Sequence, residues 1–452
     1  MTDTVLNDAA PAPQPDPAAG DRARALDAHV FHSWSVQGQT NPFAIAGGRG
    51  TTVWDHDGRE YLDFSSQLVN TNIGHQHPTV VAAIKAQADV LTTVAPATTN
   101  LVRGEAAAAV LAHAPGFQSV FFTNGGADAI ENAIRMARLH TGRDKVVSLY
   151  RSYHGNTGAA VVATGDWRRV PNEFARGHVH AFGPFLYRSE FWSETLEQEC
   201  ERALHHMRRV IEAEGPESVA AILVEAIPGT AGVIVPPPGY LAGLRALADR
   251  FGAMLIMDEV MAGFGRAGEW FAHDAHDVRP DLIAFAKGVN SGYVPVGGVI
   301  VSPEIHETFS RRVFPGGLTY SGHPLAAASI VATLGAMADE GIVDNARRIG
   351  TDVLGPGLAE LAERHAMIGE ARGAGVFWAL DLVADPETRE PVGADVIGAL
   401  KGALLRRGLL PFAADNRIHV VPPCVVTDDE VRQALAIYDE AFAEVSGAEV
   451  AA

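Results

Sequence analysis

A buried strand is predicted by Asp281-Leu282-Ile283-Ala284-Phe285-Ala286-Lys287-Gly288, an apolar run that ends on a lysine. A second apolar run, Met254-Leu255-Ile256-Met257-Asp258-Glu259, ends on acids. A charge at the end of a buried strand is costly to desolvate unless it is paired, neutral or covalently used. Taken alone, a lysine at the end of an apolar strand is explained sufficiently by a side chain whose amine reaches solvent. Asp258 and a glycine turn earlier in the chain favour a chemical role.

The glycine turn lies within Phe121-Phe122-Thr123-Asn124-Gly125-Gly126-Ala127-Asp128-Ala129-Ile130-Glu131, which predicts a strand, a turn and a helix in that order. Free N–H groups at such a helix start bind anions, and small residues let a phosphate approach closely. The lysine, the strand-end acid and this turn together predict a pyridoxal phosphate site. In such a site Lys287 forms a Schiff base with the aldehyde, and Asp258 pairs with the pyridinium nitrogen.

The composition sets broad limits on the class of protein. A chain of 452 residues is too long for one small core, so two or more domains are expected. The net charge of −19 argues against nucleic acid and anionic membrane as partners. The two cysteines, Cys200 and Cys424, provide neither a disulfide framework nor a metal-ligand spacing, so we predict no metal site and a reducing, cytoplasmic location.

The beginning of the chain differs from the rest. It is rich in Ala, Pro and Asp and has no cationic, apolar pattern of a signal peptide, so residues 1–25 are predicted to form a disordered tail. Residues 49–64 alternate around Asp57-Gly58 and predict a β-hairpin. No run approaches the roughly 18 apolar residues of a membrane-spanning helix.

From about residue 76, short apolar strands alternate with helices, which is typical of an α/β fold with a mainly parallel sheet between helices. These strands are predicted at 120–123, 146–150, 219–225, 254–258, 282–285 and 298–301. After a long helix at 323–340, helices at 344–365, 394–407 and 428–445 mix with strands at 376–382 and 418–421. We therefore predict an N-terminal segment over 26–75 that joins the small domain, a large cofactor-binding domain over 76–325, and a smaller α+β domain over 326–452.

A competing motif lies at Gly263-Phe264-Gly265-Arg266-Ala267-Gly268, which matches the dinucleotide-binding pattern G-x-G-x-x-G. It follows a strand, but the next residues lead to Pro280 rather than through a full amphipathic helix. Because a Rossmann turn needs that helix, we interpret the match as coincidental.

The chain resembles the class III aminotransferases, which are pyridoxal-phosphate enzymes of fold type I. The resemblance covers about residues 30–445 and rests on five motifs in order: Asn124-Gly125-Gly126-Ala127-Asp128, Tyr153-His154-Gly155, Asp258-Glu259-Val260 with Gly263-Phe264-Gly265-Arg266, Lys287-Gly288, and Thr319-Tyr320-Ser321-Gly322-His323-Pro324. Phe64-Ser65-Ser66-Gln67-Leu68-Val69-Asn70 and Gly74-His75-Gln76-His77-Pro78 look most like the taurine:pyruvate enzymes within the ω-amino acid:pyruvate group.

The resemblance implies a role for each matched residue. Lys287 and Asp258 would be the catalytic pair, with Tyr153 and Val260 on opposite faces of the cofactor. The phosphate would be bound by the glycine turn of one subunit and by Thr319 of its neighbour, so a homodimer with shared active sites, or a tetramer of such dimers, is expected. The full set of expected cofactor-binding residues is Gly125, Gly126, Ala127, Tyr153, His154, Glu225, Asp258, Val260, Lys287 and Thr319.

The substrate-binding residues expected from the resemblance are Leu68, Phe412 and Arg417. Many relatives carry a mobile arginine where Phe412 stands, and a glutamate at the position of Glu225 that neutralises it. Two interpretations stay open: Arg417 and Glu225 form this carboxylate switch, or Arg417 is a surface cation beside Asp415.

The expected activity is transamination in two half-reactions, from an ω-amino acid, a taurine-like compound or an amine to pyruvate or another small 2-oxo acid. A racemase, mutase or decarboxylase would use the same lysine and aspartate. A catalytically silent binding or scaffolding relative is a third possibility, against which the retained Lys287, Asp258 and glycine turn argue.

Overall fold

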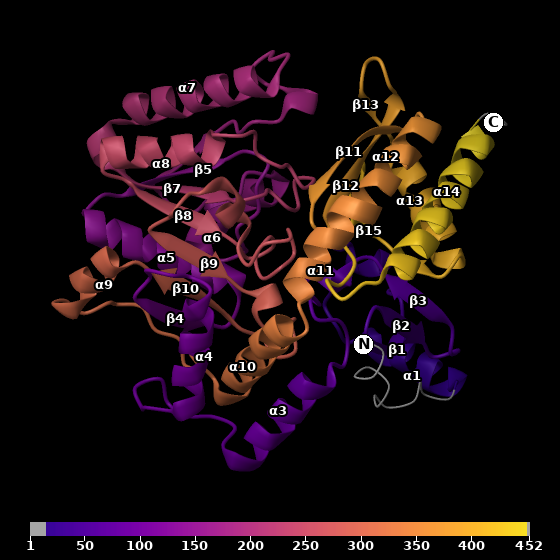
Figure 1. Cartoon of the computed structure of the whole chain (residues 1–452), viewed down its shortest axis with the longest axis horizontal. Helices are drawn as coiled ribbons and strands as arrows, with labels where there is room; N and C mark the ends of the chain where they lie inside the picture. The colour runs from indigo at the N-terminus through magenta and orange to yellow at the C-terminus, as the bar shows by residue number, and fades with distance from the viewer. Residues whose placement is uncertain (1–14, 450–452) are drawn as a thin grey trace.

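The computed structural model describes residues 15–449 and contains one large sheet of seven strands. The order across the sheet is β4 (Ser119–Thr123), β10 (Gly297–Val301), β9 (Leu282–Phe285), β8 (Met254–Asp258), β7 (Val219–Glu225), β5 (Lys145–Leu149) and β6 (His178–Ala181) (Figure 1). The strands from β9 to β6 are parallel, and β10 is antiparallel to both of its neighbours. The six predicted strands are confirmed; β6 was not predicted.

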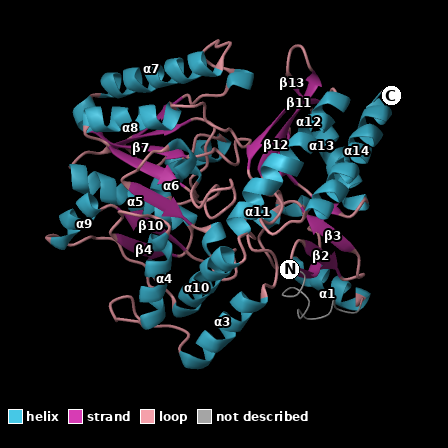
Figure 2. Cartoon of the chain, in the orientation of Figure 1, coloured by secondary structure: helices cyan, strands magenta, loops and turns pink. Residues whose placement is uncertain are grey.

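Helices cover both faces of this sheet, because its strands are apolar on both sides. Ile222 and Val224 of β7 belong to the core beneath α7 (Leu196–Glu214) and α8 (Tyr240–Phe251). Successive strand residues point to opposite faces, so Leu223 packs instead beneath α5 and α6. Their bounds are Gly126–Thr141 for α5 and Gly158–Ala163 for α6. Figure 2 shows α7 and α8 together along one side of the strands.

Helix α4 (Leu101–Ala112) packs beside β4 at one edge of the sheet. The long helix α10 (Pro324–Asp339) packs against α3 (Pro78–Val90) and α4. The other helices of this part are α2 (Ser66–Val69), α9 (Pro303–Ser310) and the short 3₁₀ turns η2 (Gln37–Gln39), η3 (Trp167–Asn172), η4 (Leu186–Arg188), η5 (Pro216–Ser218), η6 (Ala272–His276) and η7 (Lys287–Val289). No single helix within residues 15–449 has the length and apolar composition to cross a bilayer.

The C-terminal part is a smaller α+β unit. One sheet runs β11 (Ile368–Ala374), β12 (Phe377–Asp385), β16 (Arg417–Val420) and β15 (Phe412–Ala414), with β13 (Glu390–Pro391) beside β12. Its helices are α11 (Ile342–Ile349), α12 (Gly355–Arg364), α13 (Ala394–Arg406) and α14 (Asp428–Glu449). The helix predicted at 344–365 is interrupted by a π-helical turn, η8 (Gly350–Leu354), between α11 and α12.

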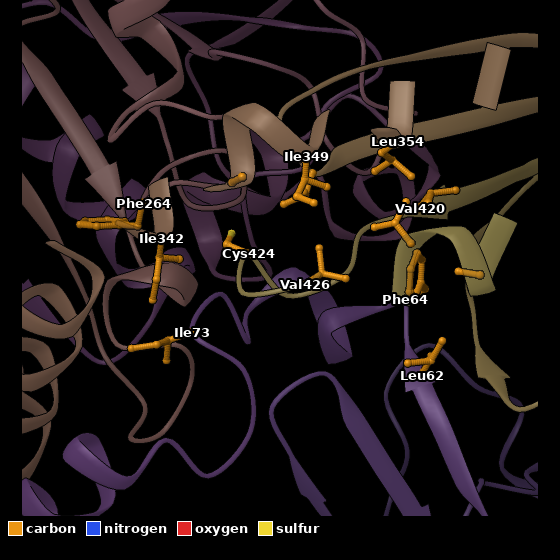
Figure 3. Packing of buried hydrophobic residues seen from close by; sticks show 14 of the residues in the cluster. Leu62, Phe64, Ile73, Phe264, Ile342, Ile349, Leu354, Val420, Cys424 and Val426 are labelled. Atoms are coloured by element: carbon orange, nitrogen blue, oxygen red, sulfur yellow. The ribbon is translucent and has the colours of Figure 1, made fainter. Parts of the chain in front are cut away.

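The N-terminal hairpin packs with this C-terminal part. Strands β1 (Ile45–Arg49), β2 (Thr52–Asp55) and β3 (Glu60–Asp63) form a sheet that β14 (Leu409–Leu410) extends, parallel to β3. Figure 3 shows Leu62 and Phe64 of the hairpin region beside Val420, with Ile349 of α11 across the same core. Segments from the two ends of the chain therefore share one hydrophobic core, while the exact domain limits at residues 75 and 325 stay predictions.

The predicted disorder of residues 1–25 is wrong for the described part, because Pro17–Asp27 forms helix α1. Asp16 caps this helix by accepting a hydrogen bond from the backbone N–H of Ala19. The backbone N–H of Asp16 donates to the carbonyl of His56, 2.8 Å away, and ties the helix start to the hairpin. Residues 1–14 lie outside the described part of the chain.

The Gly263–Gly268 motif forms a tight turn, followed by the single 3₁₀ turn η6 rather than by a long helix. Its Arg266 is fully buried. The guanidinium donates to Asn72 Oδ1 at 2.8 Å, to Ser66 Oγ at 3.1 Å and to the carbonyl of Pro422. This arginine therefore joins the large sheet to the N-terminal and C-terminal segments, which is a structural role and not nucleotide binding.

Candidate active site

A cavity of about 340 Å³ lies where three parallel strands end. Glu225 ends β7, Asp258 ends β8, and Lys287 follows β9 at the start of η7. Ligands in open α/β sheets bind at the carboxyl ends of the strands. Nine of the ten expected cofactor-binding residues line this cavity: Gly125, Gly126, Ala127, Tyr153, His154, Glu225, Asp258, Val260 and Lys287.

Asp258 is buried and is held by two hydrogen bonds. Its Oδ2 accepts from Nδ1 of His154 at 2.7 Å, and its Oδ1 accepts from the backbone N–H of Val260 at 3.0 Å. Burial alone would lower the pKa of His154, but the hydrogen bond and the charge of Asp258 raise it overall. The charge of Asp258 therefore favours the protonated form of His154, and His154 fixes the direction of the carboxyl group.

Lys287 presents its amine to the same cavity. Burial lowers the pKa of this lysine, although the negative charges of Asp258 and Glu225 oppose the shift. A lowered pKa increases the fraction of neutral amine, which is the nucleophilic form. The backbone of Lys287 is left-handed, with φ of +42°, an uncommon conformation for a residue with a side chain. Because this side chain lines the cavity, the explanation of a lysine that merely reaches solvent fits the structure poorly.

The glycine turn forms the opposite end of the cavity. Gly125 precedes the first residue of α5, so the free N–H groups of a sixteen-residue helix point toward the cavity. A Cβ on Gly126 would stand 2.8 Å from Cγ1 of Val260, and one on Gly155 would stand 2.6 Å from Cβ of Ala127. The space at this helix start therefore depends on the two glycines and suits a compact anion.

The donor set fits pyridoxal phosphate. An amine, a carboxylate that can pair with a ring nitrogen, an aromatic side chain and a helix N-terminus surround one enclosed space, as the cofactor's aldehyde, pyridine ring and phosphate require. Lys287, Asp258, Tyr153 and the Gly125–Ala127 turn are the residues that would hold it.

Glu225 is buried beside Asp258 and accepts two backbone hydrogen bonds. Its Oε1 accepts from Tyr153 at 3.1 Å and its Oε2 from Gly229 at 2.8 Å. Burial and the charge of Asp258 together raise the pKa of Glu225 to about 7, against the opposing charge of His154 and the two backbone hydrogen bonds. Within the described chain no ion pair joins Glu225 to an arginine.

A second cavity of about 750 Å³ continues from the first. Tyr153, Thr230, Met261 and Lys287 line both. The second cavity contains Leu68, Phe412 and Arg417, the three residues expected to contact substrate. Phe412 stacks on His419 with ring centroids 4.6 Å apart. Burial lowers the pKa of His419 to about 3, so this neutral ring adds no charge to the cavity wall.

Arg417 matches neither of its two interpretations fully. It pairs with Asp415, but its side chain is only 15% exposed, so it is not a surface cation. It also contacts the carbonyl of Thr230 at 3.5 Å, and its Nε is buried without a hydrogen-bond partner among the described residues. The side chain of Arg417 therefore lines the second cavity, while its Nε is buried close to Gly232.

Sequence reasoning missed most of this second cavity. Three further arginines line it, each with an acid partner: Arg151 with Glu190, Arg168 with Asp166 and Arg188 with Asp381. Trp34, Trp167 and Phe185 add aromatic walls. The one local signal was the dense run Asp166-Trp167-Arg168-Arg169, because an aromatic residue between charges is typical of a binding loop.

Thr319 differs from the other expected residues. It lies in an exposed turn and lines neither of the two cavities. Its contact with the phosphate of a neighbouring subunit stays a prediction.

Comparison with known proteins agrees with this geometry. The model of the family described as aminotransferase class-III matches residues 34–442. The taurine–pyruvate aminotransferase of Rhodobacter capsulatus is 33% identical over 434 residues, which cover 90% of this chain and 91% of the relative. The structure of the taurine:2-oxoglutarate aminotransferase from Bifidobacterium kashiwanohense, in complex with PLP and glutamate, is 41% identical with a TM-score of 0.91, over 94% of this chain and 98% of that one.

A further solved structure extends the likeness to amine-converting enzymes. The thermostable (S)-enantioselective ω-transaminase from Thermomicrobium roseum is 33% identical with a TM-score of 0.89, over 94% of this chain and 98% of that one. The family is defined by pyridoxal phosphate and by transamination, the chemistry that the lysine, the aspartate and the glycine turn fit. The chain belongs to the class III aminotransferases and is a pyridoxal-phosphate-dependent transaminase of fold type I.

Proposed function

We propose that the amine donor is a short primary amine with an anionic group at its far end, an ω-amino acid or an aminosulfonate such as taurine. The acceptor is a 2-oxo acid, pyruvate or 2-oxoglutarate. The observation that carries this proposal is the guanidinium of Arg417 in the wall of the substrate cavity, which Leu68 and Phe412 also line. A guanidinium binds carboxylate or sulfonate oxygens with strong, directional hydrogen bonds. Relatives named for taurine and for both acceptors support the same class of substrates.

The residues of the chain divide the work of the reaction. Pyridoxal phosphate, when bound, supplies the aldehyde that receives the amino group and a ring that withdraws electrons. Nζ of Lys287 would take the proton from the donor carbon that bears nitrogen and pass it to the cofactor's aldehyde carbon, and in the second half-reaction it would move a proton in the opposite direction, to the acceptor carbon. The carboxylate of Asp258, oriented by His154, holds the proton on the ring nitrogen. Tyr153 closes one side of the ring site, and the Gly125–Ala127 turn anchors the phosphate.

The donor assignment is tested by half-reactions in which loaded enzyme is mixed with one amine at a time. Taurine and β-alanine are compared with propylamine, which has a similar length but no anionic group. Arg417→Met removes a charge-assisted hydrogen bond worth roughly 1.5–3 kcal/mol, so kcat/KM for taurine should fall about 10- to 150-fold. The value for propylamine should stay within about threefold, less than 0.7 kcal/mol.

Arg372→Met is the matched control. Arg372 also packs against Gly232, beside Arg417, but it does not line the cavity, so its loss should leave the taurine-to-propylamine ratio unchanged. An equal loss for both amines in Arg417→Met would contradict the donor assignment. A wild-type enzyme that prefers propylamine would contradict it as well.

We also propose a homodimer with shared active sites, working in the cytoplasm. The dimer is supported by the exposed turn of Thr319, which the family resemblance assigns to the neighbouring subunit's phosphate site. The location is supported by Cys200 and Cys424, which form no disulfide.

A further inference from the structure

Arg168 lines the second cavity against Tyr153, which lines both cavities, and it is fixed from three directions. Its guanidinium carbon lies 3.7 Å from the centre of the Tyr153 ring and 5.8 Å from that of Trp34. The carboxylate of Asp166 accepts from Nε at 3.0 and 3.1 Å and also from Nη2. The same carboxylate caps the η3 turn by accepting from the backbone N–H of Arg168 at 2.9 Å. The head group is therefore held rigidly on the outer face of Tyr153.

This arrangement leaves one end of the guanidinium available. Asp166 occupies Nε and Nη2, and no hydrogen bond within the described chain occupies Nη1. The side chain is 15% exposed and lines the same cavity as Lys287. A desolvated guanidinium with free N–H groups in a substrate cavity is a receptor for a carboxylate.

The position of Arg168 along the cavity decides which carboxylate of a substrate it can bind. In a 2-oxo acid the carboxylate is bonded directly to the carbon that reacts, so its receptor must lie beside Lys287. Arg168 satisfies this condition, because it lines the second cavity together with Lys287 and packs on Tyr153, which lines the first cavity with the same lysine. Phe412, on the wall of the same cavity, is stacked on His419 and offers no charge to a carboxylate.

We propose that Arg168 determines specificity for the acceptor by binding the α-carboxylate of the 2-oxo acid through Nη1, with Asp166 as the residue that positions it. The proposal deepens the function proposed above and rests on its 2-oxo acid acceptor. Arg417 then contacts the group at the far end of the substrate, and Arg168 contacts the group at the reacting carbon. Since donors such as taurine have no α-carboxylate, this contact belongs to the second half-reaction alone.

The experiment isolates that half-reaction. Protein loaded with pyridoxamine phosphate is mixed with pyruvate or with acetaldehyde, which is pyruvate with hydrogen in place of the carboxylate. Arg168→Met should lower kcat/KM for pyruvate about 10- to 150-fold, the range for one lost charge-assisted hydrogen bond. The value for acetaldehyde should change less than about threefold, within the effect of a neutral surface contact. Arg168→Lys keeps the positive charge but not the planar set of N–H donors of the guanidinium, so kcat/KM for pyruvate should fall by an intermediate factor.

Two controls separate recognition from structural support. Arg169 is the next residue of the same turn, pairs with Glu173 and does not line either cavity, so Arg169→Met should leave both acceptors unaffected. Propionate binding to loaded protein, measured by calorimetry, should weaken in Arg168→Met by a factor similar to that for pyruvate. If Arg168 only supports Tyr153, both acceptors lose rate equally, and that result overturns the proposal.

No donor enters this assay, so its outcome is independent of whether taurine-like amines are the donors. An unchanged kcat/KM for pyruvate in Arg168→Met overturns the role of Arg168 while leaving the donor assignment intact. If Arg168→Met does not fold, the ratio of pyruvate to acetaldehyde in Arg168→Lys decides instead: a lowered ratio supports the proposal, and an unchanged one overturns it.

Discussion

Oδ2 of Asp258 and Nδ1 of His154 are 2.7 Å apart inside the cavity that Lys287 also lines. Because His154 donates a hydrogen bond to Asp258, this carboxyl group can face the cofactor with a fixed orientation, and its charge raises the pKa of His154. The chain therefore prepares the charge of the ring site before the cofactor is bound. A charged group that is already oriented stabilises the transition state most strongly in a site that excludes water.

Asp258→Asn should slow the half-reaction with any donor by at least about 10³-fold, roughly 4 kcal/mol. An amide does not hold the proton on the ring nitrogen, and it leaves His154 without its counter-charge. Single-turnover absorbance spectroscopy measures this rate on protein with matched cofactor content. A loss of at most about tenfold, 1.4 kcal/mol, would mean that Asp258 is a structural residue.

Lys287→Ala should abolish turnover and leave the fold and the non-covalent binding of the cofactor largely intact. The glycine turn and Asp258 do not depend on this amine for their own contacts. Borohydride treatment followed by mass spectrometry should attach the cofactor to Lys287 of the wild type and to no residue of the variant. Attachment elsewhere in the variant would assign the covalent link to a different lysine.

The stability of the cofactor-free protein should depend on pH through Glu225. Burial raises the pKa of this group to about 7 in the folded chain, against 4.5 for the ordinary carboxyl. Between pH 4.5 and about 7 the folded protein keeps a proton on Glu225 that the unfolded chain has lost. The stability that this proton contributes is therefore complete below pH 4.5, and it is lost as the pH rises through about 7. The loss amounts to about 3 kcal/mol.

Glu225→Gln removes this titration and keeps the volume of the side chain. Urea unfolding of both proteins at pH 5 and pH 8 should show wild-type stability falling relative to that of the variant by about 3 kcal/mol. The variant is expected to be less stable at pH 5, since Tyr153 and Gly229 both donate to this carboxyl. Parallel pH profiles for the two proteins would show that Glu225 is not protonated in the folded state near neutral pH.

If Thr319 binds the phosphate of the neighbouring subunit, cofactor and dimer are linked thermodynamically. A ligand that binds only the assembled form stabilises it in proportion to ln(1 + [L]/Kd). Loaded enzyme should therefore resist dilution into monomers better than cofactor-free enzyme, and Thr319→Val should narrow this gap by roughly 1.5–3 kcal/mol. Analytical ultracentrifugation over a dilution series measures both forms. A fully active monomer at nanomolar concentration would refute the shared site.

The chemistry-bearing ends of the strands could be predicted from the sequence because the signal is local. Asp258 and Lys287 each interrupt an apolar run, and parallel strands bring such ends together at one edge. Strand β6 (His178–Ala181) escaped prediction because it is four residues long, is half polar and lies at the sheet edge. The end of the predicted tail was wrong although Asp16-Pro17 is a local helix-start pattern; the hydrogen bond from Asp16 to His56 adds a long-range contact that the sequence does not show.

The substrate cavity could not be predicted to the same degree. Arg151, Arg168 and Arg188 lie on loops and short turns, and tertiary packing alone brings them together with Arg417 from β16. For Arg266 the sequence showed a glycine-rich motif, but only the fold reveals that its guanidinium is buried between three segments of the chain. A residue whose role depends on long-range contacts is not marked by any repeating pattern in the sequence.

Transfer of nitrogen from donor to acceptor, with Lys287 moving the proton, is the central claim, and an isotope experiment tests it most directly. The loaded wild-type enzyme is given ¹⁵N-labelled taurine and unlabelled pyruvate or 2-oxoglutarate, and the new amino acid is analysed by mass spectrometry, with Lys287→Ala as the control. We predict ¹⁵N-alanine or ¹⁵N-glutamate in a one-to-one ratio with the consumed donor, and no label transfer in the variant. Donor consumption that releases ammonia or carbon dioxide without labelling the acceptor, or undiminished transfer in Lys287→Ala, would contradict the account.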